Sequence, residues 1–292
     1  VWFTANTNFT GPVHTNERFS FANNPSAHFT ADVTQHLSKA RFYNNGWPLL
    51  LDADYNGTKD VPVFDTSFQR SYDLIELPST VTQNDLKNQA LGVGSEPGSN
   101  GIYVPNYGTN VTGGIYIRGN QGSPTDDSTI NMAVGTNGPV YTISRSGSPT
   151  TTVTVDYLAN GGTGSTTVNS LTYQGIPDGI GNEGIIIYVN DDIGSLSGTV
   201  QKDTNVTVSA ERDIIITNHI LYEEYNPSPP SEHLNTQDYD NILGILSWGG
   251  NVRIGTSAPD DVNIHGVVMA PHGVFSVDNY NVGSPSGTTT LL

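Results

Sequence analysis

The chain has 292 residues, with 32 glycines, 17 prolines and no cysteine, and only 13% of its residues are charged. This composition favours many strands and turns over long helices, which draw on Ala, Leu, Glu and Lys. The formal net charge is −17, and the 11 basic residues are scattered. A broad basic footprint for nucleic acid, a disulfide and thiolate chemistry are therefore excluded.

The sequence shows no signal peptide and no apolar run long enough to span a membrane. It begins at Val1 without Met, already in strand-like sequence, and it stops at the apolar pair Leu291-Leu292. We therefore expect a mature or trimmed piece of a longer protein that makes no membrane contact of its own.

Residues 1–100 predict a mixed region. Polar and apolar side chains alternate over residues 1–42, which is typical of short strands and loops. A helix over residues 30–41 is also possible. The clearest helix is predicted near residues 82–91. There Thr82 and Asp85 form a capping-box pattern, and Gly92 is a natural residue to end the helix.

Residues 101–292 predict a β-rich region. The segment PVYTISRSGSPTTTVTVDYLANGGTGSTTVNSLTY, residues 139–173, predicts antiparallel strands joined by Gly-rich turns. The segment GIIIYVN, residues 184–190, is apolar on both faces, as expected of a strand that is buried on two sides.

After Gly184 one motif recurs, an Asn or Asp followed by two β-branched apolar residues with one residue between them. It starts at Asn205, Asp213, Asn251 and Asp261. With the loop-like, Pro-rich segment 223–241 set aside, this spacing predicts a parallel β-solenoid from about residue 184, built of coils of roughly 18–19 residues around one continuous core. A β-sandwich is the alternative, because its strands also recur every 8–12 residues. The predicted core positions are Val206, Val208, Ile214, Ile216, Val252, Ile254, Val262 and Ile264.

The predicted fold class is therefore mainly β. A C-terminal parallel β-solenoid follows a mixed N-terminal part that carries one short helix and antiparallel strands.

The sharpest chemical motif is DADYNGTKD, residues 52–60. Oxygen-bearing residues alternate there before and after Gly57, as in the first half of a calcium loop. The Glu expected at the twelfth position is replaced by Val63, for which Asp65 is the nearest substitute. An Asx-rich turn without metal is the alternative. The predicted Ca²⁺ ligands are Asp52, Asp54, Asn56, Thr58 and Asp60.

Other titratable residues show no catalytic pattern. Adjacent acids at 126–127, 191–192 and 260–261 would form a sugar-cleaving site only if they converged, and solvated turn charges are the simpler interpretation. The seven histidines lack metal-binding spacing, and His219 and His265 are expected at corners of the fold. We therefore predict no catalytic residue, no organic cofactor and no enzymatic turnover.

Four stretches carry a family resemblance: GPVHTNERFSF (11–21), GGIYIRGN (113–120), residues 184–222, and VNIHGVVMAPHGVFSVDNYNVGSPSG (262–287). Together they resemble an uncharacterised surface domain that follows the N-terminal helix of some PilX-like minor pilins, including a competence-associated one. The resemblance implies an extracellular type IV pilus component with a solenoid-bearing head and no catalytic residues. The apolar pilin helix is lacking here, which fits a clipped ectodomain or a free-standing secreted filament subunit.

We therefore predict an extracellular structural or adhesion component, the head of a pilin-like protein or a subunit of a surface filament. Expected partners are pilus or filament subunits, through strand addition at the chain termini, and surface glycans. One alternative is a carbohydrate-active or carbohydrate-binding β-helix protein, whose active form would need acids clustered with an Arg or Lys. Another is a DNA receptor at a pilus tip, which the charge of −17 disfavours.

Overall fold

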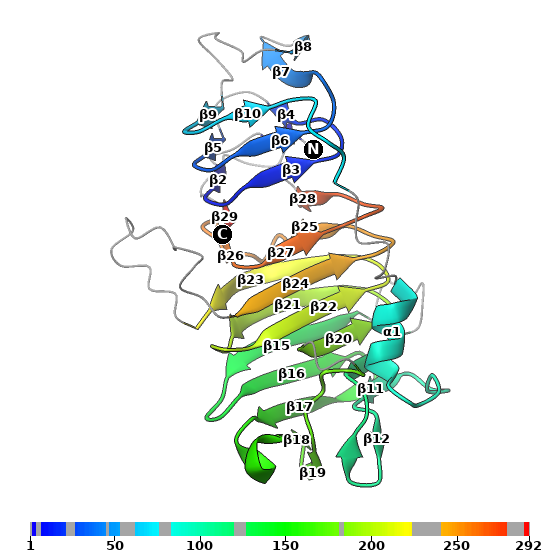
Figure 1. The fold of residues 1–292 in the computed structure, drawn as a ribbon. Coiled ribbons are helices and arrows are strands. Elements are labelled where there is room, and N and C mark those ends of the chain that lie inside the picture. Colours follow the sequence, from blue (N-terminus) through cyan, green and yellow to red (C-terminus); the bar gives the residue numbers. More distant parts are fainter. Residues whose placement is uncertain are drawn as a thin grey trace. The chain divides into compact units, whose positions relative to one another are not determined.

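The structure is a computed structural model that describes residues 2–3, 7–21, 27–44, 47–52, 62–75, 83–119, 127–180, 184–223, 241–278 and 289–291. Over these residues the fold is mainly β, as predicted, with a single α-helix (Figure 1). The chain divides into two compact units, and each is considered by itself. Unit 1 comprises Val1–Ser79, Pro259–Ile264 and Asn279–Leu292, and unit 2 comprises Thr80–Ala258 and His265–Asp278.

Unit 1 consists of short strands that pair mostly in parallel. His14, for example, lies opposite Thr34, 20 residues further along the chain. Among its described strands, β8 alone runs antiparallel to its neighbour, β7. Three groups of strands form: β1 (Trp2–Phe3), β4 (Ser20–Phe21), β7 (Ala40–Asn44) and β8 (Trp47–Leu51); β3 (Val13–Thr15), β6 (Val33–Gln35) and β10 (Phe68–Gln69); and β26 (Asn263–Ile264), β29 (Thr289–Leu291), β2 (Thr7–Phe9), β5 (His28–Phe29) and β9 (Val63–Phe64).

The possible helix over residues 30–41 is not formed, because β6 and the start of β7 occupy that segment. Val33 and Gln35 are both buried and the residue between them is not, which is the two-residue period of a strand.

Phenylalanine side chains fill the core of unit 1. Phe9, Phe29 and Phe64 occupy matching positions on β2, β5 and β9, and their ring centroids lie 4.7 Å and 5.3 Å apart in turn. Paired strands are themselves about 4.8 Å apart, so the strand register alone brings the rings into a stack. Phe21 and Phe42 are also paired, on β4 and β7, and their ring centroids lie 5.4 Å apart with the rings tilted by 33°. Parallel pairing of this kind was not predicted for the N-terminal part.

Unit 2 alternates between two sheets. We call two consecutive strands of the chain a strand pair when the first lies in a six-stranded sheet and the second in a longer sheet. Within each sheet, the strands of successive pairs are hydrogen-bonded to one another in parallel. The five strand pairs are β14 (Ile115–Arg118) with β15 (Ser128–Val134), β20 (Ile185–Val189) with β21 (Ile193–Val200), β22 (Asn205–Ala210) with β23 (Ile214–Tyr222), β24 (Ile242–Ser247) with β25 (Val252–Ile254), and β27 (Val267–Met269) with β28 (Phe275–Val277).

Apolar side chains line up in rows between these two sheets. Ile185 is paired with Val206, and Ile193 with Ile214, and all four are buried. All eight predicted core positions are buried, but Val262 and Ile264 belong to unit 1, so their burial is confirmed and their place in one common core is not. The predicted repeat of 18–19 residues is too short. Ile193 pairs with Ile214, 21 residues on, and Val252 with Phe275, 23 residues on, whereas Asn251 lies 38 residues after Asp213, across the insertion. Setting aside the whole of segment 223–241 had removed part of a coil together with the insertion.

An antiparallel ladder extends the longer sheet beyond β15, as predicted. It consists of β16 (Pro139–Arg145), β17 (Ser148–Asp156), β18 (Ser165–Val168) and β19 (Leu171–Gln174). The short strands β13 (Asn110–Val111) and β12 (Asn106–Tyr107) follow β19 at the end of this sheet. The six-stranded sheet ends at β11 (Gly101–Tyr103), which is antiparallel to β14.

The predicted helix is confirmed as α1 (Gln83–Leu91), which lies against the six-stranded sheet (Figure 1). Its apolar face packs on the outward side chains Tyr116, Ile186 and Tyr188. This cover explains why β20 is buried along its whole length, as predicted. Gly92 has φ +61° and ends the helix, also as predicted. No helix in the described part of the chain is long and apolar enough to cross a membrane.

Candidate functional site

The predicted calcium loop lies almost wholly outside the described residues. Asp52 is described and exposed, whereas Asp54, Asn56, Thr58 and Asp60 fall within 53–61. Asp65, the substitute ligand, has its Oδ1 2.9 Å from His28 Nε2 in unit 1. Within the described ranges, no group of three or more His, Asp or Glu side chains is placed to hold a metal ion. Calcium binding therefore stays a prediction.

The interpretation of the acid pairs as solvated turn charges is wrong for Asp191 and Asp192. Asp191 is 1% exposed, and its side chain fills the space beside Gly119, where a Cβ would come within 2.4 Å of it. Asp192 forms an ion pair of 3.2 Å with Arg212 Nε. Asp260 and Asp261 are exposed, as predicted, and Asp126 lies outside the described residues.

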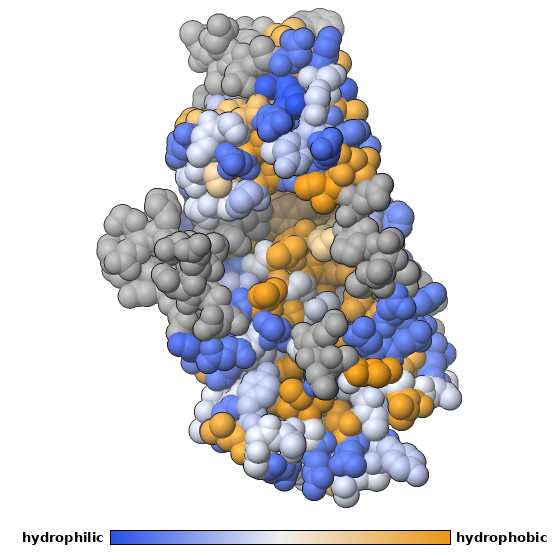
Figure 2. All heavy atoms as spheres, in the orientation of Figure 1, coloured by the Kyte–Doolittle hydropathy of each residue, from blue (hydrophilic) through white to orange (hydrophobic). Residues whose placement is uncertain are grey.

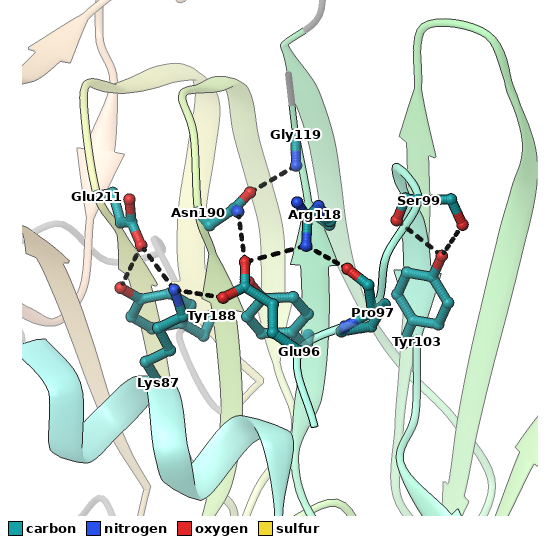
Figure 3. A network of polar contacts seen from close by, with 11 residues as sticks. Lys87, Glu96, Pro97, Ser99, Tyr103, Arg118, Gly119, Tyr188, Asn190 and Glu211 are labelled. Atoms are coloured by element: carbon teal, nitrogen blue, oxygen red, sulfur yellow. Dashed lines mark hydrogen bonds and ion pairs between the residues drawn. The ribbon is translucent and has the colours of Figure 1, made fainter. Parts of the chain in front are cut away.

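A cluster of charged and phenolic side chains joins α1 to the six-stranded sheet (Figure 3). Glu96 lies at its centre, in the segment that follows α1. One carboxylate oxygen is 3.0 Å from Lys87 Nζ. The other accepts hydrogen bonds from Tyr116 Oη at 2.9 Å, from Arg118 Nη1 at 3.3 Å and from Asn190 Nδ2 at 3.3 Å.

Glu211 is the second acid of this cluster. Its Oε1 accepts a 3.0 Å hydrogen bond from Tyr188 Oη and lies 3.6 Å from Lys87 Nζ. Lys87 therefore bridges the two carboxylates, as Figure 3 shows. Acids clustered with Lys and Arg are what a carbohydrate-active enzyme would need. The pKa values of these acids bear on whether the cluster can transfer protons.

The pKa directions favour fixed charges over proton transfer. The hydrogen bond from Lys87 is the largest influence on Glu96 and helps to hold its pKa below the ordinary value near 4.5. Burial raises the pKa of Tyr116 and of Tyr188 above 10, so both phenols stay protonated and donate. A glycosidase acid needs a raised pKa and access to its substrate. Glu96 has the opposite shift, so we interpret the cluster as the fastening of α1 to the sheet.

His265 lies at a turn of unit 2, as predicted for a corner histidine. It is fully buried, and its Nδ1 accepts a 3.0 Å hydrogen bond from the backbone N–H of Tyr222. Burial is the main reason that its pKa falls to about 4. A neutral imidazole that accepts a backbone hydrogen bond is a structural element of the turn. The corner predicted for His219 is wrong, because this half-buried residue lies within β23.

The outward side chains of the longer sheet form a nearly uncharged surface. Thr152, Thr142, Asn131 and Ser197 lie side by side on four neighbouring strands, and the next row includes Thr129 beside Ser195. Hydrogen bonds of 3.1 Å and 2.5 Å link Asn131 to Ser197 and Ser195 to Thr217. We name this surface the hydroxyl face; it comprises Thr129, Asn131, Ala133, Val140, Thr142, Ser144, Thr152, Thr154, Thr167, Thr172, Ser195, Ser197 and Thr217, all of them exposed or half-buried.

Sequence reasoning missed both the cluster around Glu96 and the hydroxyl face. The cluster unites residues from α1, the following segment and two strands, which no local motif connects. The face had a visible signal, because Thr and Ser alternate with apolar residues in TTTVTVD and STINMAV. That alternation was used only to predict strands.

Comparisons with known proteins identify no relative of this chain. No family model matches it, and neither does any curated protein or solved structure. The resemblance to a pilin-associated surface domain therefore stays a prediction that rests on the four sequence stretches alone.

Proposed function

We propose that this protein is an extracellular structural and adhesion component, the head of a pilin-like protein or a subunit of a surface filament, and that the hydroxyl face is its adhesive surface. The observation that carries the proposal is the hydroxyl face itself. It extends over the strands from β19 to β23 in a protein of net charge −17, and the residues that compose it are all uncharged, although Asp156 lies on the same side at the end of β17.

The finer architecture belongs to the same proposal. Five strand pairs repeat the same passage between two sheets, and the parallel registers continue from pair to pair. We infer that unit 2 is a parallel β-solenoid with an antiparallel extension. In a solenoid each repeat contacts its neighbours, and the outer faces become extended surfaces on a stiff support. Such a support suits a role in adhesion.

The chemistry of the hydroxyl face favours a neutral polyhydroxylated ligand. Each Thr or Ser hydroxyl donates one hydrogen bond and accepts others, as sugar hydroxyls do. The Thr methyl groups, with Ala133 and Val140, offer apolar contact to the carbon faces of sugar rings. Because the protein is strongly acidic, acidic polymers would be repelled, whereas neutral polysaccharides would not.

The test is co-sedimentation of the purified protein with insoluble cellulose and chitin. We expect saturable binding to at least one of them, and Thr142→Glu should weaken it at least tenfold by placing a charge in the middle of the face. The matched control is Thr256→Glu, at an exposed threonine outside the face. Equal binding by the two variants, or no binding by the parent protein, would contradict the proposal.

A carbohydrate-binding β-helix protein that acts outside any pilus is the second candidate, since the hydroxyl face serves either role. The coding sequence upstream of Val1 separates the two. A pilin leader followed by a long apolar helix would favour the pilin-like head, and any other upstream domain would favour the free binding module.

A further inference from the structure

One end of unit 2 has a half-open cavity that is lined by both apolar and polar side chains. The cavity holds about 310 Å³ and is lined by Ile102 and Val104, in and just after β11, and by Leu171 and Tyr173 of β19. In Figure 2, orange residues reach the surface in the region where Figure 1 labels β11 and β17.

The strand register shows that this cavity is the uncovered end of the core. Leu171 is paired with Val168 on β18, and Val168 in turn with the buried Val153 on β17, so all three occupy one inward row. Yet Leu171 is 63% exposed. Stacked repeats are normally closed by a terminal element with a polar outer side. Here the apolar row ends at Leu171 on β19, and in the described residues β13 continues the sheet beyond β19 only at Gln174.

This end also lacks the charges that normally keep strand edges apart. Residues 101–117 and 157–177 contain no Asp, Glu, Lys or Arg, although the chain as a whole carries 28 acids and 11 bases. Natural proteins protect exposed edges with charges, Pro or bulges. Within the described chain, β11 pairs with β14 alone, and β19 has a partner on its far side only at Gln174.

We propose that this end binds a second copy of the same chain, end to end, around a twofold axis. The required partner is an uncharged strand edge with apolar side chains at alternate positions, and Leu171 and Tyr173 provide one. Two copies of net charge −17 repel each other over most of their surfaces, so the charge-free end is where they can meet. A twofold contact of this kind is self-complementary and closes after two subunits.

The contact area is small, so the dimer is weak. Stable interfaces bury about 800 Å² on each partner, and one open end with a few apolar side chains offers less. We therefore expect a dissociation constant on the order of 10–100 µM. This contact is independent of the proposed adhesion by the hydroxyl face, because the cavity lies at the end of the strand stack and not on that face.

Sedimentation equilibrium tests the dimer. The average mass of the parent protein should rise from nearer the monomer mass toward twice that value as its concentration increases from about 5 to 500 µM. Leu171→Lys should remain monomeric over this range. The control Ile242→Lys makes the same charge change at a 59% exposed residue on β24 and should dimerise like the parent. A monomeric parent, a dimeric Leu171→Lys variant or a mass beyond the dimer would each overturn the proposal.

A cross-linking experiment measures the same contact without weakening it. Because the chain has no cysteine, a single introduced cysteine can link only to its counterpart in another copy. Ser170→Cys lies at the cavity and should form a disulfide-linked dimer under mild oxidation, at least tenfold faster than the control Ser257→Cys at an exposed residue elsewhere in unit 2. Equal rates would overturn the end-to-end arrangement, whereas glycan binding would be unaffected by that result.

Discussion

One carboxylate oxygen of Asp213 accepts a 2.7 Å hydrogen bond from the backbone N–H of Asn251, which lies 38 residues further along the chain. A hydrogen bond of the same kind, from a backbone N–H to an Asp or Asn side chain, joins the strand pairs before and after this one. Asp192 accepts from the N–H of Asp213 at 2.8 Å, and Asn251 accepts from the N–H of Val274 at 3.0 Å. These side chains form a ladder where the chain passes from one sheet of unit 2 to the other. The ladder fixes the register of successive strand pairs.

Replacing Asp213 by Ala should destabilise unit 2 by about 2 kcal/mol, because a half-buried carboxylate that accepts from Asn251 and pairs with Arg253 is lost. Thermal unfolding followed by circular dichroism measures the loss. Asp213→Asn should retain part of the stability, since its amide oxygen still accepts the backbone N–H. Asp260→Ala, at an exposed acid, should change the stability by less than about 0.5 kcal/mol. Equal losses at Asp213 and Asp260 would contradict the role of the ladder.

The cluster that fastens α1 should respond to acid. The pKa of Glu96 is lowered in the folded protein, so its contribution to stability is fully present above the unfolded pKa near 4.5 and is lost as the pH falls through the lower, folded pKa. Glu96→Gln should therefore melt below the parent protein at pH 7, and the gap should close as the pH falls below the unfolded pKa near 4.5 and through the lower, folded one. Because Glu96 is 35% exposed, the gap should be modest. A gap that is independent of pH would contradict the ion-pair role.

The parallel pairing of unit 1 was predictable from a repeat that went unused. Residues 9–13 and 29–33 both read Phe-Thr-x-x-Val, and the structure pairs Phe9 with Phe29 and Val13 with Val33. A third copy, Phe64 to Phe68, is harder to see because a longer stretch of chain precedes it and it ends in Phe. In unit 2 the Asn and Asp positions were visible in the sequence, whereas their hydrogen bonds to the next strand pair were not.

The cluster around Glu96 could not be predicted from the sequence. Glu96 and Glu211 lie far apart along the chain, and they share Lys87 only because α1 packs on Tyr116 and Tyr188. Asp191 illustrates the same limit. An Asp pair between strands is typical of a solvated turn, and its burial depends on contact with Gly119 from another strand pair.

Calcium should stabilise unit 1 if the loop at residues 52–60 binds it. With a dissociation constant of roughly 1 mM, 10 mM CaCl₂ would add about 1.4 kcal/mol through mass action, and magnesium at the same concentration would add less. Asp54→Ala should abolish the calcium effect, whereas Asp73→Ala, at an exposed acid outside the loop, should retain it. The measurement is the thermal midpoint with CaCl₂ and with EDTA. Identical midpoints would show that the loop is an Asx-rich turn without metal.

Binding of duplex DNA should be weak at physiological salt, which separates the proposed role from that of a DNA receptor. Affinity for DNA depends on cations that replace counterions along the phosphates. Here the protein has 28 acids against 11 bases, and four of those bases, Lys87, Arg118, Arg212 and Arg253, pair with carboxylates of the same chain.

Fluorescence anisotropy with a labelled 20-base-pair duplex at about 0.15 M salt is the measurement, and we expect no saturation below about 100 µM protein. Repeating the titration at about 0.05 M salt gives the number of phosphates neutralised, because the slope of log K against log salt is about −0.9 for each. We expect one or two at most. A sub-micromolar affinity with a steep salt slope would contradict the adhesion proposal and favour the DNA receptor, because it would require a basic surface that the paired arginines and Lys87 do not provide.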